Sequence, residues 1–315
     1  MIYKGFLVFF SAVLSLCICS LSEAVTVDEI KERGIIRVGT AGDYCPMSFL
    51  NPETGKYEGF DADLAEDLAA SLGVNVEFVP TSWPALMADT LAEKFDLAIC
   101  GITITEARLE KALMSIGYLE NGKTILIRAE DAGKYKTLAD VNRPDVVVME
   151  NPGGTNEKFA RANLPDARII IHDVNEEIPA LIAEGKADVM ITEMAEAGYY
   201  SKRDKRLAAP LIAQPFSSGE IGVLMNNNSS GLLDFVNSFL EENKFALKNE
   251  VGTQANYYKH TNGDYIANCK VNEGKSLLYE INLSVPSEEE ARRVCQNFGS
   301  YSEDIYGFIV KNLLQ

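Results

Sequence analysis

Short apolar strand patterns alternate with amphipathic helix patterns along this chain, and this alternation constrains the fold more than any other feature. In the first half, strand patterns cover residues 35–39, 74–79 and 97–100, and helix patterns cover 60–72 and begin again near residue 84. In the first helix, apolar residues recur every four positions on one face, and Gly73 is a natural left-handed stop after it. The β-α-β-α-β order predicts an α/β fold with a mostly parallel sheet covered by helices on both faces.

The same alternation returns in the second half of the chain. Strand patterns cover residues 146–149, 169–171 and 189–191, and a helix pattern covers 176–184. Two segments also echo each other, LAEKFDLAICGITIT (91–105) and IAEGKADVMITEMAE (182–196). Each runs from a helix end through an Asp into a buried strand and out to a polar loop. We interpret them as equivalent positions in two α/β lobes, with a ligand cleft between the lobes.

This interpretation divides the chain into four parts. A strand pattern at 221–225 and a helix pattern at 232–240 are expected to return to the first lobe. The predicted parts are 1–24, a signal peptide; 25–127 plus 215–260, lobe 1; 128–214, lobe 2; and 261–315, a small C-terminal extension.

The C-terminal extension has its own pattern. A strand is expected at 277–283, a helix that begins with Ser287 and Glu290 as a capping box, and a last helix at about 303–314. Cys269 and Cys295 are expected to form a disulfide bond within it. We interpret the extension as a structural or oligomerisation element rather than as a second active site.

The first 24 residues have the form of a secretory signal peptide. Lys4 precedes an apolar run at 6–19, and small residues at Ser22 and Ala24 form a cleavage site. The run is too short for a membrane-spanning helix, which needs about 20 apolar residues. The mature protein is therefore expected to begin at Val25, to be exported to the periplasm and to have no membrane contact after cleavage. Export permits disulfides, but the sequence leaves open whether Cys45 and Cys100 are bonded.

Charge and composition exclude several classes of function. The net charge is −17, which disfavours binding to nucleic acid or to anionic lipid, although a local Arg or Lys can still bind a small anion. The chain has only two histidines and no Cys-x-x-Cys pair, which argues against a zinc or iron–sulfur site. It also lacks a GxGxxG dinucleotide motif. We expect no metal and no organic cofactor.

Candidate functional residues follow the predicted strands, because ligands of open α/β sheets bind beyond the carboxyl ends of the strands. Arg108 on the GITITEAR loop suits bidentate binding of a carboxylate, or it forms a surface ion pair with Glu106 or Glu110. The glycine turn at 151–158 opens a helix whose N–H groups and Thr155 hydroxyl suit an anion, or it is a plain strand-to-helix turn.

Three further side chains have two interpretations each. Glu193 and Glu196 are three residues apart at a helix start, where one of them could act as a general acid if it is buried. Alternatively, both are solvated carboxylates that the helix dipole favours. Trp83, the only tryptophan, either stacks on a ligand ring in the cleft or packs in the core.

Five segments make the chain resemble a known family. They are GDYCPMSF, YEGFDADLAEDLAASLG, PTSWPALM, GITITEAR and NPGGTNEKFARANL, and the resemblance covers about residues 28–255. The chain resembles the periplasmic cyclohexadienyl dehydratases, which are built on the type 2 fold of periplasmic solute-binding proteins. The second and fourth segments are shared with plain amino-acid receptors, whereas SWP and NPGGTNEKFARANL are much more specific to the dehydratases.

The resemblance implies an activity and roles for residues. A cyclohexadienyl dehydratase converts prephenate to phenylpyruvate, or arogenate to phenylalanine, by loss of CO₂ and the ring hydroxyl. The roles carried over are Glu196 as general acid; Lys158 as a further catalytic residue; Arg108 as a carboxylate-binding residue; Gly154 and Thr155 as a second anion site; and Asp43, Tyr44, Trp83, Thr103 and Glu193 as substrate-binding residues. The family usually has Asp at the position of Glu193, which leaves the preference between the two substrates open.

The resemblance also keeps a second function in view. A non-catalytic amino-acid receptor of an ABC transporter would bind an α-carboxylate with Arg108 and an α-ammonium with Glu193. An enzyme and a receptor of this fold would both take a small carboxylate ligand, so turnover distinguishes them.

Overall fold

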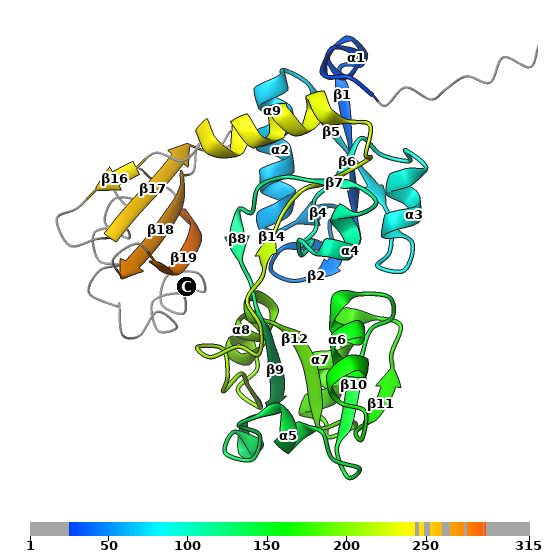
Figure 1. Ribbon diagram of the computed structural model, residues 1–315, viewed down its shortest axis with the longest axis vertical. Helices are drawn as coiled ribbons and strands as arrows, with labels where there is room; N and C mark the ends of the chain where they lie inside the picture. The colour runs from blue at the N-terminus through cyan, green and yellow to red at the C-terminus, as the bar shows by residue number, and fades with distance from the viewer. Residues whose placement is uncertain are drawn as a thin grey trace, which may run out of the picture.

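Two α/β lobes, one above the other in Figure 1, make up most of the protein. The computed structural model describes residues 25–242, 246–248, 253–259, 265–273, 276–285 and 287. The expected signal peptide at 1–24 lies outside the described residues.

Lobe 1 is built on a five-stranded mixed sheet of order β5-β1-β6-β15-β7. Its strands are β1 (Ile35–Thr40), β5 (Asn75–Pro80), β6 (Leu97–Ala98), β7 (Leu113–Met114) and β15 (Leu224–Met225). β1 runs parallel to β5 and β6, whereas β15 is antiparallel to β6 and β7. The helices are α1 (Val27–Arg33), α2 (Phe60–Leu72), α3 (Leu86–Leu91), α4 (Glu106–Leu109) and α9 (Ser230–Glu242). A small sheet joins β2 (Asp43–Tyr44), β3 (Ser48–Leu50) and β4 (Tyr57–Glu58).

Helix α2 confirms the four-residue periodicity read from the sequence. Leu64, Leu68 and Leu72 are buried in the core of lobe 1. Gly73 has a φ of 74°, and its N–H donates to the carbonyl groups of Ala69 and Ala70. A left-handed residue at this point satisfies the last carbonyls of the helix, which is why the helix ends where the pattern predicts.

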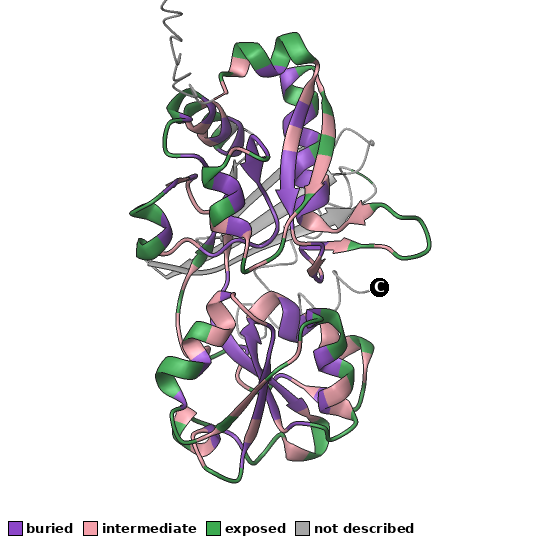
Figure 2. Cartoon of the chain, turned by 90° about the vertical axis from the view of Figure 1, so that its right-hand side faces the viewer, coloured by how far each residue is buried: buried purple, intermediate pink, exposed green. Residues whose placement is uncertain are grey.

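Lobe 2 repeats the arrangement with the sheet order β11-β10-β12-β9-β13. Its strands are β9 (Lys123–Arg128), β10 (Val147–Glu150), β11 (Arg168–Ile171), β12 (Val189–Glu193) and β13 (Leu207–Ala208). Its helices are α5 (Leu138–Val141), α6 (Thr155–Asn163), α7 (Ile178–Ala183) and α8 (Met194–Arg203), with 3₁₀ turns η1 (Ala129–Asp131) and η2 (Asn175–Glu177). Figure 2 shows the strands of this lobe buried between helices whose outer faces are exposed.

The two echoing sequence segments occupy equivalent positions, as the sequence predicted. Asp96 precedes β6 and accepts a hydrogen bond from the backbone N–H of Arg37 on β1, at 2.7 Å. Asp188 precedes β12 and accepts one from the backbone N–H of Val147 on β10, at 2.9 Å. In both lobes an Asp therefore joins the starts of two neighbouring parallel strands.

The chain crosses between the lobes twice. The first crossing lies between β8 (Leu119–Glu120) and β9, and the second between β13 and β14 (Glu220–Ile221) (Figure 1). The second crossing includes the predicted boundary at 214/215. The predicted first boundary at 127/128 is too late, because residues 123–127 pair along β12 within the sheet of lobe 2. The strand pattern at 221–225 also divides: β14 pairs with β8, whereas β15 joins the main sheet of lobe 1.

A four-stranded antiparallel sheet follows α9. Its strands in order are β16 (Ala246–Lys248), β17 (Thr253–Lys259), β18 (Tyr265–Glu273) and β19 (Ser276–Val285). The predicted strand at 277–283 is thus present, but the sheet begins before residue 261, so the predicted boundary at 260/261 separates two of its paired strands. The expected Cys269–Cys295 bond and the two expected helices lie outside the described residues. Among the described helices, none is long and apolar enough to cross a membrane.

Candidate functional site

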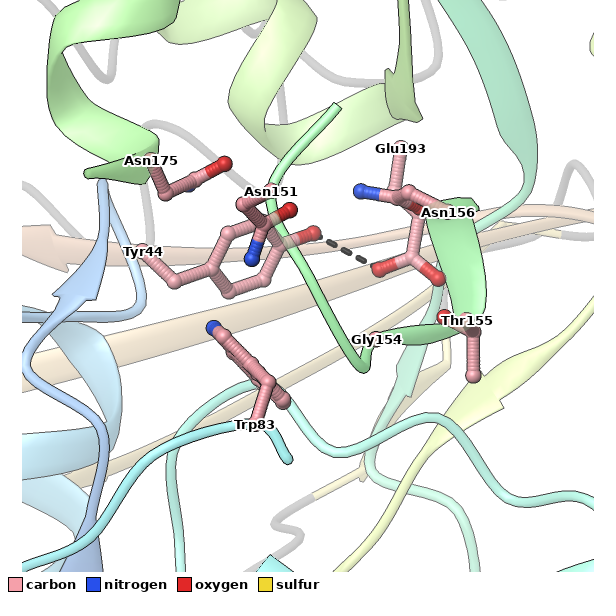
Figure 3. Close-up of a pocket in the computed structure, with 9 residues that line it drawn as sticks. Tyr44, Trp83, Asn151, Gly154, Thr155, Asn156, Asn175 and Glu193 are labelled. Atoms are coloured by element: carbon pink, nitrogen blue, oxygen red, sulfur yellow. Dashed lines mark hydrogen bonds between the residues drawn. The ribbon is translucent and has the colours of Figure 1, made fainter. Parts of the chain in front are cut away.

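A cavity lies between the two lobes, at the carboxyl ends of their parallel strands. Lobe 1 provides two aromatic side chains and a glycine, and lobe 2 provides amides, a hydroxyl and a carboxylate (Figure 3). Among the described residues, the lining consists of Tyr44, Trp83, Gly101, Asn151, Gly154, Thr155, Asn156, Asn175 and Glu193.

The lobe 1 wall is aromatic and closely packed. The rings of Tyr44 and Trp83 meet edge to face, with centroids 5.9 Å apart. The indole N–H of Trp83 donates to Oδ1 of Asp43 at 2.9 Å, which fixes the ring in the wall. Burial raises the pKa of Asp43. Gly101 has a φ of +74°, and a Cβ atom there would lie 2.3 Å from the Tyr44 ring, so the glycine is what allows this ring position.

Glu193 is the centre of the polar network. It ends β12, is 3 % exposed, and its carboxylate accepts hydrogen bonds from both lobes. Burial alone would raise the pKa of Glu193, but the Lys123 ammonium and the hydrogen bonds outweigh burial and lower it, so the group is ionised. Its donors are Thr103 Oγ1 (2.7 Å) and Lys123 Nζ (2.7 Å) to Oε1, and Tyr44 OH (2.7 Å) and Asn121 Nδ2 (2.9 Å) to Oε2.

Lys123 is buried directly behind the cavity lining. It is the first residue of β9, and pairing of β9 with β12 places it opposite Glu193. Its ammonium also donates to Thr155 Oγ1 at 2.6 Å and to Asn156 Oδ1 at 2.5 Å. Lys123 thereby joins the end of β12 to the first turn of α6, which begins after Gly154 at the cavity.

Glu196, in the first turn of α8, is in the opposite electrostatic situation. The residue is fully buried, and within residues 25–242 no ion pair involves it. Asn175 Nδ2 donates to Oε1 at 2.7 Å, and the Thr192 hydroxyl donates to Oε2. Burial, reinforced by the nearby carboxyl groups of Asp43 and Glu193, raises the pKa of Glu196 to about 8. Glu196 is therefore protonated at neutral pH, whereas Glu193 is charged.

Several contacts hold the lobes together around the cavity. Tyr44 and Thr103 from lobe 1 donate to Glu193 of lobe 2. In the other direction, Asn175 Nδ2 donates to the backbone carbonyl of Asp43 at 2.9 Å. Gly153 lies so close to Pro84 that a Cβ atom on it would be 2.7 Å from the proline. These contacts describe a closed arrangement of the two lobes.

The structure brings most of the residues singled out in the sequence together. Tyr44, Trp83, Gly154, Thr155 and Glu193 line the cavity, and Asp43, Thr103 and Glu196 bond directly to lining residues.

Two residues lie elsewhere. Arg108 is buried behind Thr103, where its Nη1 donates to the Thr103 carbonyl at 2.5 Å, and burial lowers its pKa. Lys158 is exposed on α6 and is not among the lining residues. It is two positions after Asn156, which at 3.6 residues per turn is about 200° around the helix.

Sequence reasoning missed several site residues. Asn121, Lys123 and Asn175 carry the network, and Asn151 and Asn156 line the cavity within the candidate anion-binding segment 151–158, in which only Gly154, Thr155 and Lys158 had been named as site residues. Lys123 gave one signal, because it is a charged residue at the start of the apolar run TILI. The amides gave none, because their roles depend on contacts between distant parts of the chain.

The cysteine question left open by the sequence has an answer here. Cys45 and Cys100 are both buried and free. Burial raises the pKa of Cys45 to about 11 and that of Cys100 to about 12, so both are thiols. In the described part of the chain, no group of three or more His, Cys, Asp or Glu side chains is placed to hold a metal ion.

Comparisons with known proteins agree with this architecture. The chain is 45% identical over 199 residues to the cyclohexadienyl dehydratase of Pseudomonas aeruginosa, covering 63% of this chain and 74% of that protein. It is 28% identical to the L-cystine-binding protein TcyJ of Escherichia coli K12, covering 73% of this chain and 85% of the relative.

Solved structures give the same fold. The ancestral amino acid-binding protein AncCDT-1, described as a precursor of cyclohexadienyl dehydratase, matches with a TM-score of 0.64 and 39% identity, covering 69% of this chain and 92% of the other. Holo ArgBP from T. maritima matches with a TM-score of 0.62 and 29% identity, covering 68% and 92%. The model of the bacterial extracellular solute-binding proteins, family 3, matches residues 36–258, and the chain belongs to that family.

Proposed function

We propose that this protein is a cyclohexadienyl dehydratase that converts prephenate to phenylpyruvate, and arogenate to phenylalanine, with Glu196 as general acid. Two independent lines support the proposal. One is the 45% identity to a cyclohexadienyl dehydratase over most of that protein. The other is the chemistry of the two carboxyl groups beside the cavity.

The carboxyl pair is the observation that carries the proposal. Glu193 and Glu196 differ in protonation at neutral pH, because Lys123 neutralises one and burial without a cation protonates the other. Environments that separate the pKa values of neighbouring carboxyl groups are typical of acid catalysis. Binding alone requires no proton donor, so a buried neutral acid beside the cavity favours the enzyme over a transport receptor.

The proposed reaction uses that acid as follows. The bond between the ring and its carboxylate breaks, and its electron pair enters the ring as CO₂ leaves. The bond from the ring to the hydroxyl group breaks at the opposite position, and the proton of Glu196 converts the departing hydroxide to water. The ring becomes aromatic, which provides the driving force. Hydroxide is a poor leaving group, so a positioned acid contributes about 10² to 10⁴-fold.

Other residues have binding roles in this proposal. The first turn of α6, with Gly154 and Thr155, offers N–H groups and a hydroxyl to one substrate carboxylate. Trp83 and Tyr44 offer an aromatic wall to the substrate ring. We assign Arg108 to a supporting role through Thr103, because its guanidinium bonds to the Thr103 backbone.

The alternative function, an amino-acid receptor, draws on the relatives that bind amino acids. One contact argues against the receptor. Glu193 is the residue expected to bind the α-ammonium of an amino acid, but the ammonium group of Lys123 already bonds to its carboxylate. We further propose that the mature chain begins at Val25 and acts in the periplasm, in line with a family of extracellular proteins.

One experiment separates the two functions. Purified protein from Val25 onward is mixed with prephenate at neutral pH, and phenylpyruvate is followed by its absorbance in alkali. We expect product well above the uncatalysed rate. Folded protein that yields no product but binds an amino acid would instead establish the receptor.

A further inference from the structure

The carboxylate of Glu193 has no position left for a ligand. An ionised carboxylate has about four lone-pair sites. Two donors bond to Oε1 and two to Oε2, all at 2.7 to 2.9 Å. Glu193 nevertheless lines the cavity. It therefore forms part of the wall that a substrate meets, with its charge and its acceptor capacity already used by the protein.

The partner of Glu193 is equally saturated. An ammonium group has three donors. Those of Lys123 bond to Glu193 Oε1, Thr155 Oγ1 and Asn156 Oδ1, at 2.7, 2.6 and 2.5 Å. The Lys123 side chain is 8% exposed, so this cation is fixed behind the lining. An ammonium group on a ligand would have to displace it or lie beside it.

The other carboxyl groups near the cavity do not compensate. Glu196 is neutral at pH 7, and Asp43 already accepts the indole N–H of Trp83, while burial raises its pKa. A cationic ligand group placed at Glu193 would thus be removed from water without a free carboxylate oxygen to receive it, which is costly. A neutral keto group at the same position carries no such cost.

We propose that Lys123 is a specificity-determining residue, which occupies the ammonium position at Glu193 and makes this protein select the 2-oxo acid prephenate over the 2-amino acid arogenate. The inference rests on the proposed function for its substrates. The backbone geometry accounts for where the Lys123 ammonium lies, because Lys123 and Glu193 are directly opposite each other in the β9–β12 pair.

The test compares kcat/KM for prephenate and arogenate in four proteins: wild type, Lys123→Met, Glu193→Gln and the double variant. We expect wild type to prefer prephenate by at least about tenfold, the worth of a lost hydrogen bond to a charged group. Lys123→Met frees the Glu193 carboxylate, so the preference should shift toward arogenate by about tenfold or more. In the double variant no carboxylate remains for the ammonium, so that shift should be lost.

Binding of the two products measures the preference between the keto and the amino group without turnover, first in the wild-type protein. Phenylpyruvate and L-phenylalanine differ only in the keto and amino groups, and each is titrated into the wild-type protein by calorimetry. Tighter binding of phenylpyruvate supports the proposal. Equal binding, tighter L-phenylalanine binding, or equal kcat/KM for the two substrates overturns it. Absence of turnover with both substrates, by contrast, refutes the dehydratase function, and the same calorimetry repeated with Lys123→Met still decides whether Lys123 sets the preference between the keto and the ammonium group.

Discussion

Glu193 and Glu196 lie three residues apart at the start of α8, and only Glu193 is paired with a cation. Their spacing places them on the same side of the helix. The difference between them comes from other elements: β9 brings Lys123 to Glu193, whereas η2 brings only the amide of Asn175 to Glu196. One local sequence thus yields a structural anion and a neutral acid.

Replacing Glu196 by Gln should remove catalysis while preserving the fold. Glutamine keeps the shape of the side chain but has no acidic proton, so we expect kcat for prephenate to fall by about 10² to 10⁴-fold. Thermal unfolding reports the fold, and Glu184→Gln, at an exposed site on lobe 2, is the matched control. Retention of wild-type kcat in Glu196→Gln would require a different acid.

The raised pKa of Glu196 should also make stability depend on pH. The folded-state pKa is about 8, compared with an ordinary value of 4.5. Between these pH values the unfolded chain releases the Glu196 proton, whereas the folded protein retains it. The contribution of protonated Glu196 to the free energy of unfolding is therefore complete below about pH 4.5 and is lost as the pH rises toward about 8. Glu196→Gln does not titrate, so its free energy of unfolding relative to wild type should increase over this range.

Urea titrations of both proteins at several pH values measure that difference. The activity profile offers an independent check, because loss of the Glu196 proton should give kcat/KM an alkaline limb centred near pH 8. A difference in unfolding free energy that stays constant from about pH 4.5 to 8 would mean that Glu196 has an ordinary pKa.

Most of the architecture could be predicted from local sequence patterns. Apolar periodicity located α2, and Gly73 marked its end, because both depend on neighbours within one or two turns. The paired roles of Asp96 and Asp188 were visible as an echo between two segments. The first lobe boundary was misplaced because the partner of residues 123–127 is β12, some sixty residues later in the chain.

The candidate site was predicted in outline for the same reason. Glu196, Thr155 and Trp83 follow strand ends, which sequence can locate. The residues that set their chemistry could not be found this way. Lys123 and Asn175 act on side chains 70 and 21 positions away, and no local pattern encodes such pairs. Whether a glutamate is neutral or charged depends on these contacts.

A methyl group at Gly101 should disturb the aromatic wall. In Gly101→Ala the new carbon would lie 2.3 Å from the Tyr44 ring, so the ring must move and its hydroxyl should lose Glu193. We expect KM for prephenate to rise by about tenfold, in keeping with one hydrogen bond to a charged group. Gly73→Ala shares the positive φ but has no atom within 4 Å of the added carbon. It should therefore lose stability while KM stays unchanged, and an equal rise of KM in both variants would contradict the contact with Tyr44.

Lys158 should be dispensable, although the resemblance assigned it a catalytic role. It is exposed on α6, whereas Lys123 provides the buried ammonium behind the cavity. We expect Lys158→Ala to change kcat/KM by less than about twofold, as for other exposed positions away from a site. Thr155→Val, on the same helix, removes the hydroxyl that bonds to Lys123 and should lower kcat/KM by about tenfold. Steady-state kinetics on both variants decide the matter: a large loss in Lys158→Ala with an intact fold would mean that α6 presents Lys158 to the substrate during turnover.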